Sequence, residues 1–302
     1  MKKFICALLS VIMIFSLTAC GASAQPPEEK EKTAADDSMQ SGIRQETEAE
    51  EKRPETAIEE AVLFEESGLK VTVKGLGREE FIGPAVKLLI ENNSDKNYTV
   101  QARNTSVNGY MMEPMFSCNV AAGKKANDSL DFMDGSLEKV GITEIACIET
   151  SFYIFNTDDW AQSFNTDIFT IKTSAYDGFQ FTYDDTGELL YEDDALRIIS
   201  KGISPDASFL GPSIVVYIEN KSDAGLMVQA RDVSVNGFMT EPVFSANTAP
   251  GKHNLTEIAF LSTALEENDI QEITEVELSF QIYEDENWLN SYETSPIALS
   301  FP

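Results

Sequence analysis

The chain has 302 residues and carries 22 Lys and Arg against 51 Asp and Glu, a formal net charge of −29. Such a surface repels nucleic-acid phosphates and anionic lipid headgroups, so the composition argues against nucleic-acid binding and against electrostatic docking on a membrane. The length is enough for more than one domain with its own hydrophobic core.

The first twenty residues have the pattern of an export signal. Lys2 and Lys3 precede a mostly apolar run that is too short to span a bilayer, and the run ends on Leu-Thr-Ala-Cys with Cys20 last. This pattern resembles the lipobox of bacterial lipoproteins. The resemblance implies that residues 1–19 are a signal peptide and that Cys20 carries palmitate and related acyl chains. These chains would anchor the protein on the extracytoplasmic face of the cell membrane.

The segment after Cys20 is acidic and poor in large apolar side chains. Residues 21–60 hold 12 acidic and 5 basic side chains. A segment of this composition cannot bury enough surface to offset its chain entropy. We therefore predict that residues 20–57 form a disordered tether between the lipid anchor and the folded part.

The remainder of the chain is a duplication. A shift of 128 residues aligns Phe81–Lys172 with Phe209–Ser300 without a gap, and 38 of the 92 aligned positions are identical. Each copy falls within the usual size range of a single domain, and the period is too long for a solenoid. We place the first repeat at residues 58–174 and the second at residues 175–302.

Each repeat is predicted to consist almost entirely of β-strands. Apolar side chains alternate with other side chains, which is typical of strands with one buried face. In the first repeat the alternating stretches are 69–73, 86–90, 148–154 and 169–171, and their counterparts recur in the second repeat. Helical patterns are confined to about one turn at 136–140 and 263–268.

Two Asn-Gly pairs are the strongest turn signals. Asn108-Gly109 and Asn236-Gly237 each suit a type I′ hairpin, whose two central residues need positive φ. If a two-residue loop closes this hairpin with a regular preceding strand, Val107 and Arg103 lie on the same face of that strand. The inward-facing residues of the strand, however, are expected to be Val100 and Ala102, which lie on the opposite face. We therefore predict a β-bulge or a strand switch between Ala102 and Val107.

About seven short strands in each repeat fit an antiparallel β-sandwich. The hydrophobic-Glu-Asn-x-Ser-Asp turn, the Gln-Ala-Arg strand and the Ser-Val-Asn-Gly hairpin recur in both copies. With these motifs the repeats resemble the immunoglobulin-like β-sandwich domains of uncharacterised Gram-positive lipoproteins, without the Cys-Trp-Cys framework of antibody domains. The resemblance implies an extracellular spacer or interaction module.

The residues offer little chemistry, so we predict no catalytic residue, no metal ligand and no cofactor. The one histidine, His253, aligns with Lys125, and we expect it to be a solvated surface residue. The acidic loops at 158–159, 184–188 and 284–286 lack the spacing of a dedicated calcium loop, and calcium binding stays open as an alternative. A disulfide between Cys118 and Cys147 also stays open, because their counterparts are Ala246 and Glu275.

Identity between the repeats is concentrated in one block. From Gly83 to Lys124, 24 of 42 positions agree, but from Lys125 to Lys172 only 13 of 48 do. One explanation for the polar residues that are identical in both repeats is a shared binding surface, with apolar anchor residues at the hairpin tips. The alternative is that these residues only stabilise the fold. The candidate binding residues are Gln101, Arg103, Tyr110, Met111, Gln229, Arg231, Phe238 and Met239.

These observations predict a non-catalytic cell-surface lipoprotein that binds or spaces an unknown protein or cell-wall partner. The alternative is a carbohydrate-binding or cell-wall-binding module in which Trp160 and Trp288 stack on sugars, which requires both indoles to be exposed. An enzyme would instead need a deep pocket lined by carboxylates with raised pKa values.

Overall fold

The computed structural model describes residues 56–285 and 287–301, without the side chains of residues 205–208. The predicted signal peptide, the acylation site Cys20 and nearly all of the predicted tether lie outside the described residues. The described residues belong to a single compact unit that runs from Arg53 to Pro302. None of the described helices is long and apolar enough to cross a membrane.

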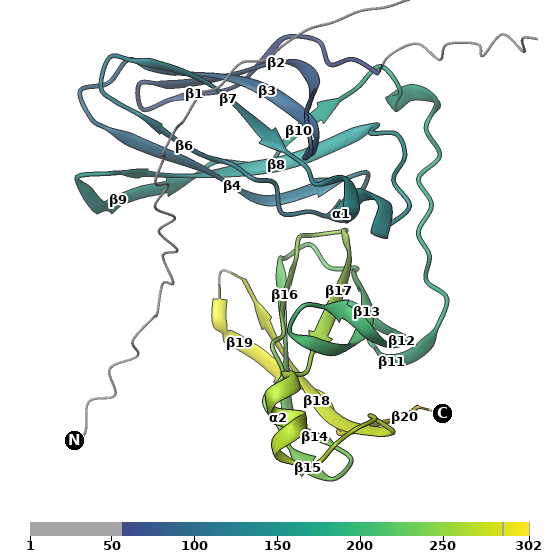
Figure 1. The fold of residues 1–302 in the computed structure, drawn as a ribbon. Helices are drawn as coiled ribbons and strands as arrows, with labels where there is room; N and C mark the ends of the chain where they lie inside the picture. Colours follow the sequence, from purple (N-terminus) through teal and green to yellow (C-terminus); the bar gives the residue numbers. More distant parts are fainter. Residues whose placement is uncertain (1–55, 286, 302) are drawn as a thin grey trace, which may run out of the picture. The chain divides into compact units, whose positions relative to one another are not determined.

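The first repeat contains two antiparallel sheets (Figure 1). One has the strand order β1-β2-β3-β7 and is built from β1 (Ala61–Glu66), β2 (Leu69–Glu79), β3 (Gly83–Asn92) and β7 (Lys125–Asp131). The other is built from β10 (Phe169–Lys172), β8 (Cys147–Asn156), β4 (Tyr98–Val107), β5 (Tyr110–Met111), β6 (Ser117–Val120) and β9 (Asp159–Asn165). In this second sheet β4 is central, because β8 pairs with one of its edges while β6 and β5 share the other.

The second repeat has the same pairing pattern (Figure 1). Four of its strands, β11 (Glu188–Glu192), β12 (Leu196–Ser208), β13 (Gly211–Asn220) and β17 (His253–Ala259), pair in that order. A parallel pairing of β17 with β5 joins them to the second sheet of the first repeat, so these strands form one ten-stranded sheet. The other sheet of the second repeat consists of β15 (Phe238–Met239), β14 (Leu226–Val235), β18 (Glu275–Glu284), β19 (Asn287–Glu293), β16 (Ser245–Thr248) and β20 (Ile297–Ser300). The short helices are α1 (Asp134–Lys139), α2 (Ser262–Glu267) and the 3-10 turn η1 (Tyr176–Gly178). The prediction of an all-β antiparallel sandwich fold is confirmed.

Two hydrophobic clusters fill the space between the sheets. The first draws mainly on the first repeat, and Val71, Ile90, Val100 and Phe152 are fully buried in it. The second lies in the second repeat, where Ile198, Ile218, Val228 and Phe280 are fully buried. The inward side chains alternate along each strand as the period-two pattern predicts.

The predicted hairpins and bulges are confirmed. Asn108 and Gly109 have φ angles of 48° and 86°, and both central residues of the second turn are likewise positive. The register of β4 against β8 shifts between Arg103 and Ser106, and Asn104 inside this bulge has a φ of 50°. The bulge restores the inward direction of Val107, which would otherwise point to solvent.

Candidate functional site

The outer face of the β4–β8 pair carries the polar residues that the repeats share. Tyr98 and Val100 of β4 point into the core, so Gln101 and Arg103 of the same strand point outward. Gln101 lies directly opposite Tyr153 of β8. Residues directly opposite on neighbouring strands have adjacent side chains. The Gln-Arg pair that both repeats share therefore lies beside the aromatic ring of Tyr153.

In the first repeat these residues form a continuous row that we call the first aromatic platform: Arg103, Tyr153, Phe155 and Trp160. The guanidinium carbon of Arg103 lies 5.6 Å from the ring centre of Tyr153, within cation–π range. Ring centres are 5.6 Å apart between Tyr153 and Phe155, and 5.5 Å apart between Phe155 and Trp160. Arg103 also donates a hydrogen bond of 3.0 Å to Gln101, which fixes the guanidinium over the sheet.

The second repeat carries the corresponding second aromatic platform: Arg231, Tyr283 and Trp288. Arg231 donates hydrogen bonds of 2.8 Å to Gln229 and 3.2 Å to the hydroxyl of Tyr283. The ring centres of Tyr283 and Trp288 lie 5.4 Å apart. Gln281 stands where the first platform has Tyr153, so the second row has one ring fewer.

Both tryptophans are exposed. Trp160 has 73% and Trp288 has 54% of its surface accessible to solvent. The indole of Trp160 is steadied by one hydrogen bond of 3.2 Å from its Nε1 to the carbonyl of Thr157. The indoles therefore lie on the surface of the two repeats and not in their cores.

Sequence reasoning did not single out Tyr153, Phe155 and Tyr283. The signal was present, since each occupies an outward position in a strand whose alternate residues are buried, such as Phe152 and Ile154. A contiguous patch of exposed aromatic side chains, and not a single one, is the feature that marks a binding surface.

The hairpin tips differ between the repeats. Tyr110 is buried at 5% exposure and Met111 is half-buried, whereas Phe238 is 49% and Met239 is 69% exposed. The proposed apolar anchors are thus accessible only in the second repeat. Arg103 of the first repeat donates hydrogen bonds to the side chain of Gln101 and to the carbonyl of Ala102.

The prediction for His253 was wrong. This histidine is only 8% exposed, and its Nδ1 lies 2.6 Å from the hydroxyl of Tyr217. The ring of Tyr183 stacks on it with 3.6 Å between ring centres, and Tyr110 lies beside it. Burial, with a smaller contribution from Lys252, lowers the pKa of His253 to about 4, so the imidazole is neutral at pH 7. Its aligned residue, Lys125, gave no sign of this environment.

Cys118 and Cys147 are both buried free thiols, so the disulfide that the sequence left as a possibility is not formed. Burial raises the pKa of Cys118 to about 12 and that of Cys147 to about 11. Both thiols therefore stay protonated at neutral pH, which makes them poor nucleophiles.

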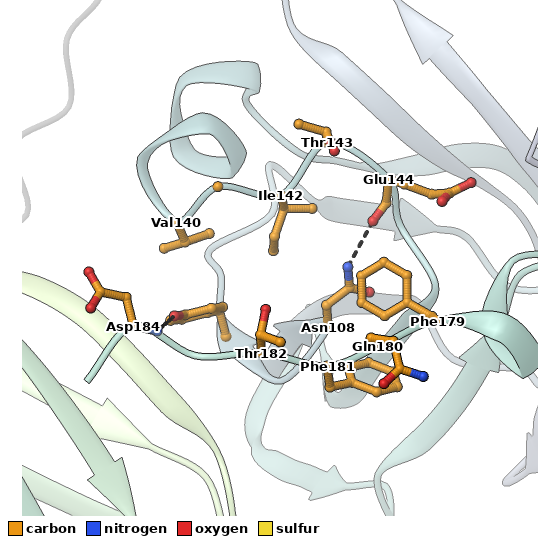
Figure 2. A pocket seen from close by; sticks show the side chains of 12 residues that line it. Asn108, Val140, Ile142, Thr143, Glu144, Phe179, Gln180, Phe181, Thr182 and Asp184 are labelled. Carbon is orange, nitrogen blue, oxygen red and sulfur yellow. Dashed lines mark hydrogen bonds between the residues drawn. The ribbon is translucent and has the colours of Figure 1, made fainter. Parts of the chain in front are cut away.

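A cavity of about 260 Å³ lies where the connecting segment 179–184 crosses the loop 140–144 (Figure 2). Phe179, Phe181 and Ile142 contribute apolar surface, and Asn108 spans part of the wall through a 2.8 Å hydrogen bond to the carbonyl of Glu144. Hydrogen bonds from Thr186 and Lys201 lower the pKa of Asp184 at its rim to about 2. This carboxyl is therefore ionised at neutral pH.

Within the described ranges, no three His, Cys, Asp or Glu side chains come together in a group that could hold a metal ion. Asp193, close to the acidic loop 184–188, accepts hydrogen bonds from the hydroxyl groups of Tyr191 and Tyr292.

No protein-family model matches the chain, and no curated protein matches it. Among solved structures, a YadV chaperone aligns at 10% identity over 72% of this chain and 92% of its own, with a TM-score of 0.24. A red sea bream transglutaminase aligns at 11% identity over 78% of this chain and 31% of its own, with a TM-score of 0.21. The chain spans about a third of that transglutaminase, and likenesses this distant carry no argument about function.

Proposed function

We propose that this chain is a non-catalytic cell-surface binding module, anchored through acylated Cys20, whose two aromatic platforms bind a glycan chain of the cell wall. The observation that carries the proposal is the exposed tryptophan beside a Gln–Arg pair in both repeats. Trp160 and Trp288 are identical although they lie in the block where only 13 of 48 positions agree.

The chemistry of the platforms suits a sugar. A pyranose ring has an apolar C–H face and hydroxyl groups around its edge. The faces of aromatic rings carry partial negative charge and attract the weakly positive C–H groups, so an exposed indole is a natural stacking surface. The amides of Gln101 and Gln229 and the guanidinium groups of Arg103 and Arg231 supply hydrogen-bond partners for hydroxyls beside it.

A pull-down with insoluble peptidoglycan, backed by titration with soluble oligomers of β-1,4-linked N-acetylglucosamine, tests the proposal. We expect Trp160→Ala and Trp288→Ala each to weaken binding by about fivefold or more, because an aromatic contact contributes about 1 kcal/mol in addition to the apolar area that it buries. The double variant should weaken binding by about the product of the two single factors, because the binding constant of a two-site chain scales with the product of its site constants.

Phe81→Ala is the matched control. Phe81 is an exposed aromatic residue of the first repeat, at 97% exposure, and lies at the β2–β3 turn away from either platform. Binding that falls equally in this variant, or that survives in the double tryptophan variant, contradicts the proposal.

A further inference from the structure

The hairpin tip of the first repeat is covered by residues of the second repeat. The backbone N–H of His253 donates a 3.0 Å hydrogen bond to the carbonyl of Gly109, and Tyr110 forms a parallel β-bridge with His253. Lys252 forms an ion pair with Glu149 of β8 at the same place. We call this set of contacts the junction.

The second repeat carries the same tip with the same backbone. Asn236 and Gly237 have φ angles of 50° and 83°, close to the 48° and 86° of Asn108 and Gly109. The Asn236 side chain accepts from the N–H of Glu275 and donates to the carbonyl of Glu272, as Asn108 does with its own counterparts. The hairpin tip that contacts residues of the second repeat in the junction is therefore present with the same backbone conformation in the second repeat.

In the second repeat nothing among the described residues covers that tip. Phe238, the counterpart of Tyr110, is 49% exposed against 5% for Tyr110, and Met239 beside it is 69% exposed. Glu277, the counterpart of Glu149, is exposed and has no ion-pair partner among the described residues. The tip therefore presents an apolar anchor next to a free carboxylate.

The complementary half of the contact lies on the first repeat. Lys124 aligns with Lys252, is exposed, and likewise has no ion-pair partner among the described residues. Lys125 aligns with His253, whose N–H donates to the opposite tip. The two halves of the Lys252–Glu149 ion pair thus recur on opposite repeats as Lys124 and Glu277, each unpaired.

We propose that this chain associates with a second copy of itself head to tail, the Phe238–Met239 tip of one copy docking on the turn at Lys124 of the next. In this contact Lys124 of one copy forms an ion pair with Glu277 of the other, and the backbone of Lys125 contacts the hairpin tip. Lys252, Glu149 and the backbone of His253 make the corresponding contacts in the junction within one chain. A head-to-tail contact uses two different surfaces, so each copy keeps a free surface at either end and further copies can add, in open chains unless the rotation closes a ring.

The contact should be weaker than the junction. No residue in the described part of the first repeat occupies the place of Tyr183, and Leu89 stands where the second repeat has Tyr217. The stacking on His253 is therefore missing, and the net charge of the chain opposes association until salt screens it. We expect association that depends on concentration.

Sedimentation velocity over a range of protein concentrations, in about 0.15 M salt, tests the proposal on the chain from Gly21 onward, which keeps every described residue. The wild-type mass should rise with concentration without stopping at a dimer. Glu277→Lys and Lys124→Glu should each weaken association by about tenfold or more, because each places like charges together. The double variant should associate again, because the ion pair is restored with its charges exchanged.

Phe238→Ala should weaken association as well, whereas Trp288→Ala, an exposed aromatic residue away from the tip, should leave it unchanged. Glu188→Lys gives the same change of charge on β11 and serves as the control for net charge. A wild-type chain that stays monomeric overturns the proposal. A dimer whose association is unchanged by Glu277→Lys and Lys124→Glu also overturns the proposal, as does a double variant that stays dissociated.

Discussion

At the residue scale, the asparagine of each Asn-Gly turn does more than close a hairpin. Asn108 is buried, and its Oδ1 accepts from the N–H groups of Ala146 and Cys147 at 2.9 and 3.0 Å. Its Nδ2 donates to the carbonyl of Glu144 at 2.8 Å. One side chain thus satisfies three backbone groups at the start of β8, and only asparagine combines this with an easy left-handed φ.

Asn108→Ala should lower the free energy of unfolding by about 2–4 kcal/mol, because three buried backbone groups lose their partner. Asn104→Ala is the matched control. Asn104 has nearly the same φ, 50°, but is exposed and makes no side-chain hydrogen bond among the described residues. It should cost only the left-handed strain, about 1 kcal/mol. Urea unfolding measures both, and equal losses would contradict the role assigned to the Asn108 amide.

At the element scale, the β2–β3 hairpin is fixed in place by close backbone approach to α1. Gly83 has a φ of 146°, and a Cβ at this position would overlap the carbonyl oxygen of Phe132. The N–H of Phe132 bonds to the carbonyl of Pro84, and the N–H of Asp134 bonds to that of Ile82. Gly211 has the same conformation against Phe260, so both repeats use this arrangement.

Gly83→Ala should therefore lower the free energy of unfolding by about 2–4 kcal/mol, since the hairpin must move away from the start of α1. Gly135→Ala, two positions into α1, is the control. A Cβ there meets nothing within 4 Å and the φ is not positive, so this change should stabilise the helix by about 0.5–1 kcal/mol. Chemical denaturation distinguishes the two, and a neutral Gly83→Ala would show that the approach is not tight.

At the scale of the whole molecule, the neutral histidine at the junction makes stability depend on pH. His253 is surrounded by Tyr110, Tyr183 and Tyr217, and Lys252 lies next to it in sequence. Its folded pKa of about 4 is below the ordinary value of 6.5. The unfolded chain therefore binds a proton between these two values that the folded chain excludes.

The free energy of unfolding should fall as the pH drops from about 6.5 towards about 4, by up to about 1.4 kcal/mol per pH unit. His253→Phe keeps an aromatic ring at the junction without a titratable group, so its free energy of unfolding should fall less steeply than that of the wild type over this window. The carboxyl of Asp184, with a pKa lowered to about 2, titrates below the window. Urea unfolding at several pH values makes the test, and an unchanged slope in the variant would refute it.

Much of the fold follows from local pattern. Alternation along strands such as 148–154 reports burial of one face, and the Asn-Gly pairs report a backbone conformation that few residues adopt. The bulge at Arg103–Ser106 can be predicted from these two signals together, because the Asn-Gly turn and the alternation of buried residues in the preceding strand require different pairing registers. The duplication adds a second, independent reading of every pattern.

Local conformations such as the alternating strands and the Asn-Gly turns can be derived from the sequence, because they depend on neighbours a few positions apart in the chain. The tertiary structure alone decided which distant residues meet. It buried His253 and Tyr110 against each other, left Phe238 exposed, and brought Arg103 beside Tyr153. Burial and contact between repeats depend on the packing of whole surfaces, which no periodicity within one strand encodes.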